Sequence, residues 1–93
     1  MSIANGVRHI ERNLEFLETD KRLIEYLTSG RVATDEIGFA DSTETIASSM
    51  LTMINETAWY IKNAHKKHKI SKEQFEGYIT LLEHYDEFIH KYL

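Results

Sequence analysis

The densest group of basic side chains in the sequence lies between residues 62 and 72. It holds five Lys and two His, and no acidic residue occurs between Thr57 and Lys72. Closely spaced ammonium groups attract phosphates and acidic protein surfaces, and a nearby aromatic side chain can stack on a base. The sequence therefore predicts a candidate surface for an anionic ligand, a nucleotide or a nucleic acid, made of Trp59, Lys62, His65, Lys66, Lys67 and Lys69.

The same Lys residues have a simpler structural explanation. Cations near the C-terminus of a helix are stabilised by the helix dipole and the unpaired carbonyl groups there, each by roughly 0.3 to 1 kcal/mol. The whole chain carries a formal net charge of -4, whereas proteins that bind a nucleic-acid backbone usually carry a net positive charge. We therefore favour the helix-end explanation, and nucleic acid is the less favoured partner.

The His and Glu residues give one partial metal motif. Glu87 and His90 have the Glu-x-x-His spacing of di-iron helical bundles, but those bundles need a second such pair and further Glu on facing helices. The chain has no Cys, which excludes thiolate nucleophiles and Cys-based zinc sites. Its four Gly are isolated, so there is no Gly-rich phosphate loop. We expect no metal, no cofactor and no catalytic residue, and hence a protein that is not an enzyme.

One pattern resembles part of a catalytic motif. Lys62 and Asn63, followed by His68, are similar to the Arg-Asn…His pattern of helical ribonucleases of the HEPN kind. In that family the motif lies at the end of a helix and supplies acid-base groups. Here Lys replaces Arg and cannot reproduce the guanidinium fork on a phosphate. The resemblance implies an HEPN-like ribonuclease as a remote alternative function.

The apolar periodicity predicts an all-α fold, a three-helix bundle in one domain spanning 1–93. A row with heptad spacing marks a first helix over 3–28, which Ser29-Gly30 should end. We predict a loop over 31–40, with room for one helical turn, in which Val32, Ile37 and Phe39 are pinned onto the bundle. Capping-box pairs then start a second helix over 42–68 and a third over 72–92, the pairs being Asp41 with Glu44 and Ser71 with Gln74.

The second predicted helix is the central one, because two adjacent apolar rows run along it. Apolar side chains also lie off the main rows of the first and third helices, in excess of what a three-helix monomer can bury. We predict that these residues form an interface and that the chain is a homodimer or higher oligomer. The predicted interface residues are Leu23, Tyr26, Leu27, Leu81 and Phe88.

Composition restricts the function further. Hydrophobic residues make up 42% and charged residues 28% of the chain, as in an ordinary globular domain. The sequence shows neither a membrane-spanning apolar stretch nor the apolar run of a signal peptide, so we expect a cytoplasmic protein. The favoured function is a small non-enzymatic protein-interaction module that binds a partner protein. Regulators, inhibitors, chaperones and immunity proteins of bacteria, phages and mobile elements are commonly of this type.

Overall fold

The computed structural model describes the backbone of residues 3–30 and 36–93 and the side chains of residues 6–30 and 42–93. It contains three helices, α1 (Ile3–Leu27), α2 (Glu36–Lys66) and α3 (Lys72–Ile89), and the described residues form no strand. The predicted all-α three-helix bundle is confirmed. None of these helices combines the length and the apolar character needed to cross a membrane, over the part of the chain described.

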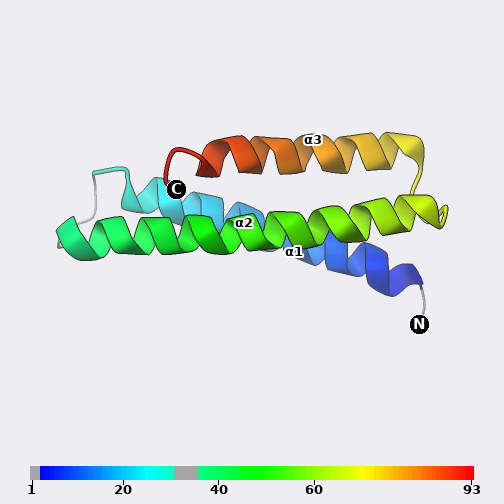
Figure 1. The fold of residues 1–93 in the computed structure, drawn as a ribbon, viewed down its shortest axis with the longest axis horizontal. Helices are drawn as coiled ribbons and strands as arrows, with labels where there is room; N and C mark the ends of the chain where they lie inside the picture. The colour runs from blue at the N-terminus through cyan, green and yellow to red at the C-terminus, as the bar shows by residue number, and fades with distance from the viewer. Residues whose placement is uncertain (1–2, 31–35) are drawn as a thin grey trace.

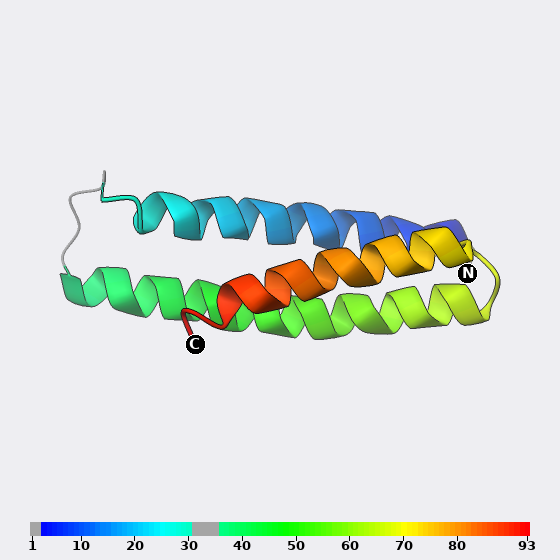
Figure 2. The same ribbon diagram turned by 90° about the horizontal axis from the view of Figure 1, so that it is seen from above.

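The three helices form an elongated bundle of 48 × 23 × 18 Å. Figure 1 shows that α2 runs antiparallel to both α1 and α3. Seen from above, α3 lies in front of the antiparallel pair made by α1 and α2 and covers one face of that pair (Figure 2). α3 has 18 residues and α2 has 31, so the end of the pair next to the linker extends beyond α3. The predicted central position of α2 is confirmed, because α2 packs against both other helices.

The heptad row of α1 forms its buried side. Ile10, Leu17 and Ile24 are spaced by seven residues, and each is fully buried. After Leu27 the chain leaves the helix, and the Thr28 hydroxyl donates to the Ile24 carbonyl at 2.8 Å. Gly30 has φ 79, a left-handed conformation that Gly adopts without a steric penalty. The predicted stop at Ser29-Gly30 is therefore confirmed.

The predicted start of α2 is wrong. The helix begins at Glu36, so residues 36–40 are helical rather than a loop and Asp41 lies inside the helix rather than at its N-cap. No Pro interrupts this segment. Each residue added to a nucleated helix gains a backbone hydrogen bond, which outweighs a local capping signal. Residues 31–35, including Val32, lie outside the described residues, as do the side chains of Ile37 and Phe39.

α2 ends two residues earlier than predicted, in a Schellman motif. The His68 N–H donates to the His65 carbonyl at 3.0 Å, and the Lys69 N–H donates to the Ala64 carbonyl at 2.8 Å. These two bonds satisfy carbonyl groups that the helix leaves unpaired. His68 occupies the left-handed position, with φ 60. The turn then leads into α3 through Ile70, which is 6% exposed.

The predicted capping box of α3 is confirmed. The Gln74 N–H donates to the Ser71 hydroxyl oxygen at 3.0 Å, and the Ser71 N–H donates to the Gln74 side-chain oxygen at 2.8 Å. At its other end α3 stops at Ile89 rather than at residue 92. The last residues form a tighter turn, with the Tyr92 N–H donating to the Ile89 carbonyl at 2.9 Å. Tightening of this kind is common where the final carbonyl groups lack helical partners.

We predict that His68→Gly stabilises the protein by about 0.5 to 1 kcal/mol. A left-handed backbone costs a residue with a Cβ about 1 to 2 kcal/mol, part of which Gly returns as entropy of the unfolded chain. Urea unfolding followed by circular dichroism measures the change. His84→Gly is the matched control, because His84 lies inside α3 and Gly in a helix interior costs about 1 kcal/mol. Equal losses in both variants would contradict the assigned turn.

Candidate functional site

The Lys cluster lies at the end of the bundle where α2 turns into α3. Lys62, Lys66, Lys67 and Lys69 are all exposed. Among the residues that the structure describes, the ion pairs are those of Lys21, Arg22 and His90, and none involves this cluster. The cluster is therefore an open, positively charged surface that follows the end of one helix and the turn.

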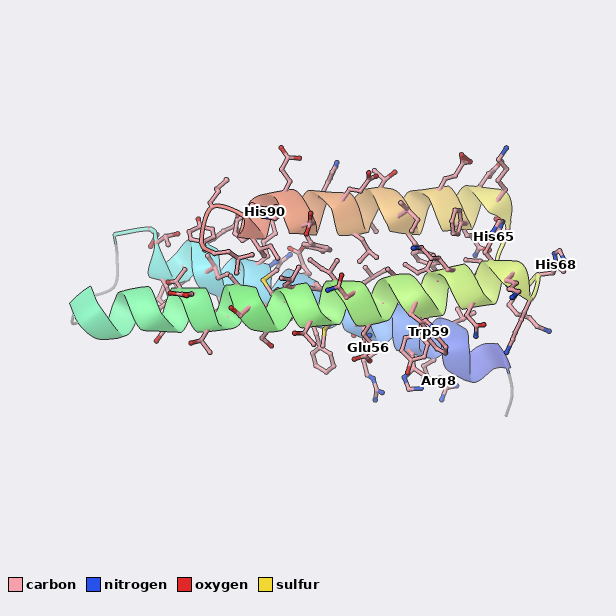
Figure 3. The ribbon with its side chains drawn as sticks, viewed as in Figure 1. Arg8, Glu56, Trp59, His65, His68 and His90 are labelled. Atoms are coloured by element: carbon pink, nitrogen blue, oxygen red, sulfur yellow. The ribbon has the colours of Figure 1, made fainter. Side chains whose placement is uncertain are left out.

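The structure does not bring all six predicted ligand-binding residues to one place. His65 is half-buried and its ring stacks on Phe75 of α3, with the ring centroids 4.3 Å apart. Trp59 is 61% exposed and points away from α3 (Figure 3). His65 thus belongs to the packing between α2 and α3, while Trp59 lies on another side of α2. The four exposed Lys remain as the charged part of the predicted surface.

The three residues of the HEPN-like pattern lie in three different environments. His68 holds the left-handed position of the turn, Asn63 is half-buried and Lys62 is exposed. Figure 3 shows His68 at the far end of the bundle, beyond the last turn of α2. The ribonuclease alternative predicts RNA cleavage that is lost in His68→Ala, and cleavage that survives this substitution would exclude it.

His90 of the partial metal motif is the C-cap residue of α3 and contacts Asp86 of that helix. The His90 Nε2 lies 3.1 Å from Asp86 Oδ2, one helical turn earlier. In the described part of the chain, no group of three or more His, Cys, Asp or Glu side chains is arranged to hold a metal ion. The contact with Asp86 therefore ties His90 to its own helix rather than to ligands on the facing helices.

Contacts between α1 and α3 centre on Glu18. The Tyr85 hydroxyl donates to Glu18 Oε1 at 2.9 Å, and the Arg22 Nε–H donates to Glu18 Oε2 at 2.9 Å. The hydrogen bond from Arg22, followed by that from Tyr85, lowers the pKa of Glu18. Burial, together with the bond to Glu18, raises the pKa of Tyr85 to about 12. One carboxylate on α1 thus holds the C-terminal half of α3.

Two of the five predicted interface residues are less exposed to solvent than expected. Phe88 is half-buried, and Lys21 Nζ of α1 lies 5.4 Å from its ring centroid. Leu27 is also half-buried. The other three are exposed as large apolar side chains, namely Leu23 at 42%, Tyr26 at 57% and Leu81 at 43%. Phe88 is therefore part of the contact between α1 and α3 rather than a surplus apolar residue.

We predict that Tyr85→Phe destabilises the protein by about 1 kcal/mol at pH 7 and by less at pH 3. A lowered folded-state pKa means that Glu18 contributes stability above its ordinary pKa of 4.5, and that this contribution is lost as the pH falls through the folded-state pKa. The figure is at the low end for a bond to a charged group, because the Glu18 side chain is 41% exposed. Urea unfolding of both proteins at the two pH values measures the difference.

Burial raises the pKa of Asp20, which acts in the opposite direction to Glu18. That contribution is present in both proteins and cancels in the comparison of Tyr85 with Phe. An equal loss at pH 3 and pH 7 would contradict the role assigned to the bond between Tyr85 and Glu18.

On the side away from α3, α1 and α2 share a surface of which Leu23 alone is among the interface residues predicted from the sequence. His9 of α1 stacks on Tyr60 of α2, with the ring centroids 5.0 Å apart. Since the helices are antiparallel, a step of seven residues forward in α1 matches seven backward in α2. Phe16 is therefore level with Met53, and Leu23 with Ile46. We call this surface the open face, defined by His9, Phe16, Leu23, Ile46, Met53 and Tyr60.

On α1, the row of residues just before the buried heptad row lies on the open face, and the row just after it faces α3. Each of its α1 members precedes a buried residue of the heptad row, as Phe16 precedes Leu17. Glu18, which follows Leu17, bonds to α3. Adjacent residues on a helix point about 100° apart, so the preceding row faces away from α3. Figure 3 shows Arg8, Glu56 and Trp59 on this same side of the bundle.

The open face is apolar from its middle to its end near the linker. Phe16 is 49% exposed, and Leu23, two helical turns further along, is exposed as well. Their neighbours across the seam, Met53 and Ile46, are half-buried at the edge of the core. The double apolar row of α2 predicts contact with two helices or an interface in an oligomer. One of these two rows continues onto this surface.

Comparison with models of known protein families, with curated proteins and with solved structures finds no match to this chain.

Proposed function

We propose that this chain is a non-enzymatic protein-interaction module that binds a partner protein through the open face. The observation that supports the proposal is that Phe16 and Leu23, large apolar side chains seven residues apart on α1, are both exposed on this face. Single exposed apolar side chains are ordinary, whereas contiguous ones mark surfaces that bind other molecules. Regulators, inhibitors, chaperones and immunity proteins work through surfaces of this kind.

The composition of the open face fits a binding role. Aromatic residues and Met are enriched at protein interfaces, where a rigid aromatic ring buries a large area at a small cost in conformational entropy. Here Phe16, Met53 and Tyr60 lie in one strip. The buried row next to it already holds α1 and α2 together, so Phe16 and Leu23 are not needed to close the bundle.

Site-specific photo-crosslinking in cells that express the chain tests the proposal. A benzophenone amino acid is placed at Phe16, and a matched one at Thr80, which is exposed on α3. We expect a protein adduct from position 16 and none from position 80. The adduct should disappear when Leu23→Glu is added to the chain. Adducts of equal yield at both positions, or an adduct that survives Leu23→Glu, would count against the open face as the binding surface.

The exposed Lys cluster supports the alternative of an oligomeric anion-binding module. Four ammonium groups without ion pairs among the described residues lie at one end of the bundle. That alternative predicts binding of a nucleotide or an oligonucleotide that weakens with salt. The Lys66→Glu, Lys67→Glu double variant should abolish such binding. If the chain binds neither ligand at low salt, the cluster serves only the helix end.

A further inference from the structure

The only Trp of the chain is held by aromatic contacts while most of its surface stays in solvent. Trp59 is 61% exposed. Its ring meets the Tyr60 ring edge-on, with the centroids 5.1 Å apart, and Tyr60 in turn stacks on His9 of α1 at 5.0 Å. The Arg12 Nη2 lies 3.2 Å from His9 Nδ1. These contacts order the indole in advance, so a ligand that stacks on it costs the protein little further conformational entropy.

Two exposed Lys share the side of α2 on which Trp59 lies. Residues that are three, four or seven apart lie on one side of a helix, and Lys62 and Lys66 follow Trp59 by three and seven residues. Lys66 is about 10 Å from Trp59 along the helix axis, at 1.5 Å per residue. Lys67 is also exposed and borders this side towards α1. We call this surface the Trp-Lys face, defined by Trp59, Lys62, Lys66 and Lys67.

The Lys side chains of the Trp-Lys face are free to bind a ligand. None of them makes a hydrogen bond or an ion pair with another residue in the described part of the chain. The last carbonyl groups of α2 accept instead from the backbone N–H groups of Lys67, His68 and Lys69. The helix dipole favours cations within the last turn, but it gives no reason for an exposed Trp about two turns before the helix ends. The dipole thus explains the Lys residues and not their combination with Trp59.

The acidic residues of α2 are concentrated at the other end of the helix. All of them except Glu56 lie at or before Glu44, and no residue over 45–55 is charged. Glu44 precedes Lys62 by about 27 Å along the helix, at 1.5 Å per residue. Salt screens exposed charges over about 8 Å at physiological ionic strength. The acidic end of α2, which contributes to the net charge of -4, therefore has little effect on an anion bound at the Trp-Lys face.

The neighbouring segments neither add to the charge of the Trp-Lys face nor cancel it. Over residues 6–15 of α1 the charged side chains are two Arg and two Glu, namely Arg8, Glu11, Arg12 and Glu15. Over residues 69–76 they are two Lys and two Glu, namely Lys69, Lys72, Glu73 and Glu76. Each set has a net charge of zero. Glu56 lies on the same side of the bundle as Trp59 (Figure 3), so three Lys less one Glu leave two positive charges.

We propose that the Trp-Lys face binds single-stranded nucleic acid without regard to its sequence. A base stacks on the indole of Trp59, and the phosphates beside that base lie against the three Lys. Aromatic side chains accept any base, because every base has a π face, and proteins that bind single strands combine such platforms with a positively charged surface along the backbone. The inference is separate from the open face. It develops the anion-binding alternative by naming the polymer and the residue that contacts its bases.

The shape of the Trp-Lys face favours a strand over a free nucleotide. Its residues stand on the outer side of one helix, whereas sites for small molecules are concave and bury most of their ligand. A strand gains its affinity from several exposed contacts along its length. In a duplex each base is already stacked and paired, and taking one out costs free energy. A single strand offers Trp59 a free base and offers the Lys side chains closely spaced phosphates.

Fluorescence of Trp59 tests the contact with a base directly, because no other Trp contributes to the signal. Oligo-dT and oligo-rU of about twelve nucleotides, within the usual range of single-strand sites, are titrated into the wild-type chain at low salt. We expect saturable quenching by both. Heparin and poly-glutamate carry charge without bases and should leave the signal unchanged. Equal quenching by these polymers, or none by the oligonucleotides up to about 1 mM, tenfold above the weakest typical non-specific Kd, would overturn the proposal.

The salt dependence of binding tests the phosphate contacts. Each phosphate neutralised on a single strand contributes about -0.7 to the slope of log K against log salt concentration, so three Lys should give a slope of about -2. Anisotropy of a labelled oligo-dT measures this slope. Lys66→Gln should make it shallower by about 0.7. Lys91→Gln is the matched control, since Lys91 is exposed beyond the C-terminal end of α3, and it should leave the slope unchanged. Equal slopes in the two variants would overturn the placement of the phosphates.

Replacement of the indole separates stacking from charge. Trp59→Leu should weaken binding of the labelled oligo-dT by about fivefold or more and leave the salt slope unchanged, because no cation is lost. Tyr26→Leu is the matched control, since Tyr26 is an aromatic residue 57% exposed on α1, and it should bind as the wild type does. Circular dichroism checks that both variants keep their helices. Equal affinities of the two variants would overturn the role of Trp59.

Failure of this inference and failure of the proposed function can be told apart. Leu23 is level with Ile46, about 30 Å along the helix from Lys66 at 1.5 Å per residue. Leu23→Glu should therefore remove the photo-adduct at position 16 and leave the quenching by oligo-dT intact. Lys66→Gln should weaken oligo-dT binding and leave the adduct intact. An adduct without quenching in the wild type overturns the nucleic-acid site alone, and quenching without an adduct overturns the open face alone.

Discussion

Leu17→Ala should lower the free energy of unfolding by about 3 kcal/mol, within the 2 to 5 kcal/mol range for buried Leu. Leu17 is fully buried at the centre of α1. Its neighbour Glu18 bonds to α3, so the cavity would open where all three helices meet. For a domain of this size the loss corresponds to a melting temperature lower by about 12 to 24 °C. Because such domains are stable by only about 5 to 15 kcal/mol, the variant loses a large share of its stability.

Phe16→Ala is the matched control, since Phe16 is the larger side chain and precedes Leu17 in the sequence. It is 49% exposed, so its truncation should cost the monomer less than about 1 kcal/mol. Thermal unfolding of both variants, measured at one low protein concentration, gives the two losses. If Phe16→Ala destabilised the chain as much as Leu17→Ala, the assignment of Phe16 to an exposed row and of Leu17 to the buried row would be wrong.

Thr57→Val should destabilise the protein by about 2 kcal/mol although it changes the side-chain volume very little. The Asn13 Nδ2–H donates to Thr57 Oγ1 at 3.0 Å, and the Thr57 hydroxyl donates to the Met53 carbonyl at 2.6 Å. Asn13 is 5% exposed and Thr57 is fully buried. Valine cannot accept, so the amide of Asn13 would be left unpaired inside the bundle, at a cost of about 1 to 3 kcal/mol.

A double-mutant cycle separates this cost from lost packing. Asn13→Leu should cost less than Thr57→Val, because the Thr57 hydroxyl keeps its bond to Met53. The double variant should recover most of the loss, since both polar groups are then gone. Urea unfolding of the four proteins gives the coupling energy. Additive losses would show that the pair makes no specific contribution to stability.

The sequence predicted the elements that depend on local chemistry. Ser71 and Gln74 satisfy each other's backbone N–H groups across four residues, so the start of α3 needs no other part of the chain. The heptad row of α1 likewise identified its buried side. The same reasoning failed at Asp41, because a capping signal competes with continued helix formation. Only the energetics of the whole helix decide that competition.

The candidate surface was harder to predict. Phe16 lies one residue from Leu17, and nothing local in the sequence favours exposing the larger of the two side chains. Exposure depends on which side of the pair of α1 and α2 is covered by α3. Asn13 was missed for a similar reason, since a polar residue on an apolar side is stable only if a partner such as Thr57 arrives from another helix.

By itself the sequence determined three helices, the central position of α2 and the helix ends other than the start of α2, because helix periodicity and capping act over a few residues. The tertiary structure alone decided how the Lys and aromatic residues are grouped. It separated Trp59 from His65 and paired His9 with Tyr60. It also left the open face uncovered. The physical reason is that helix register and the side on which α3 packs depend on contacts between residues far apart in the chain.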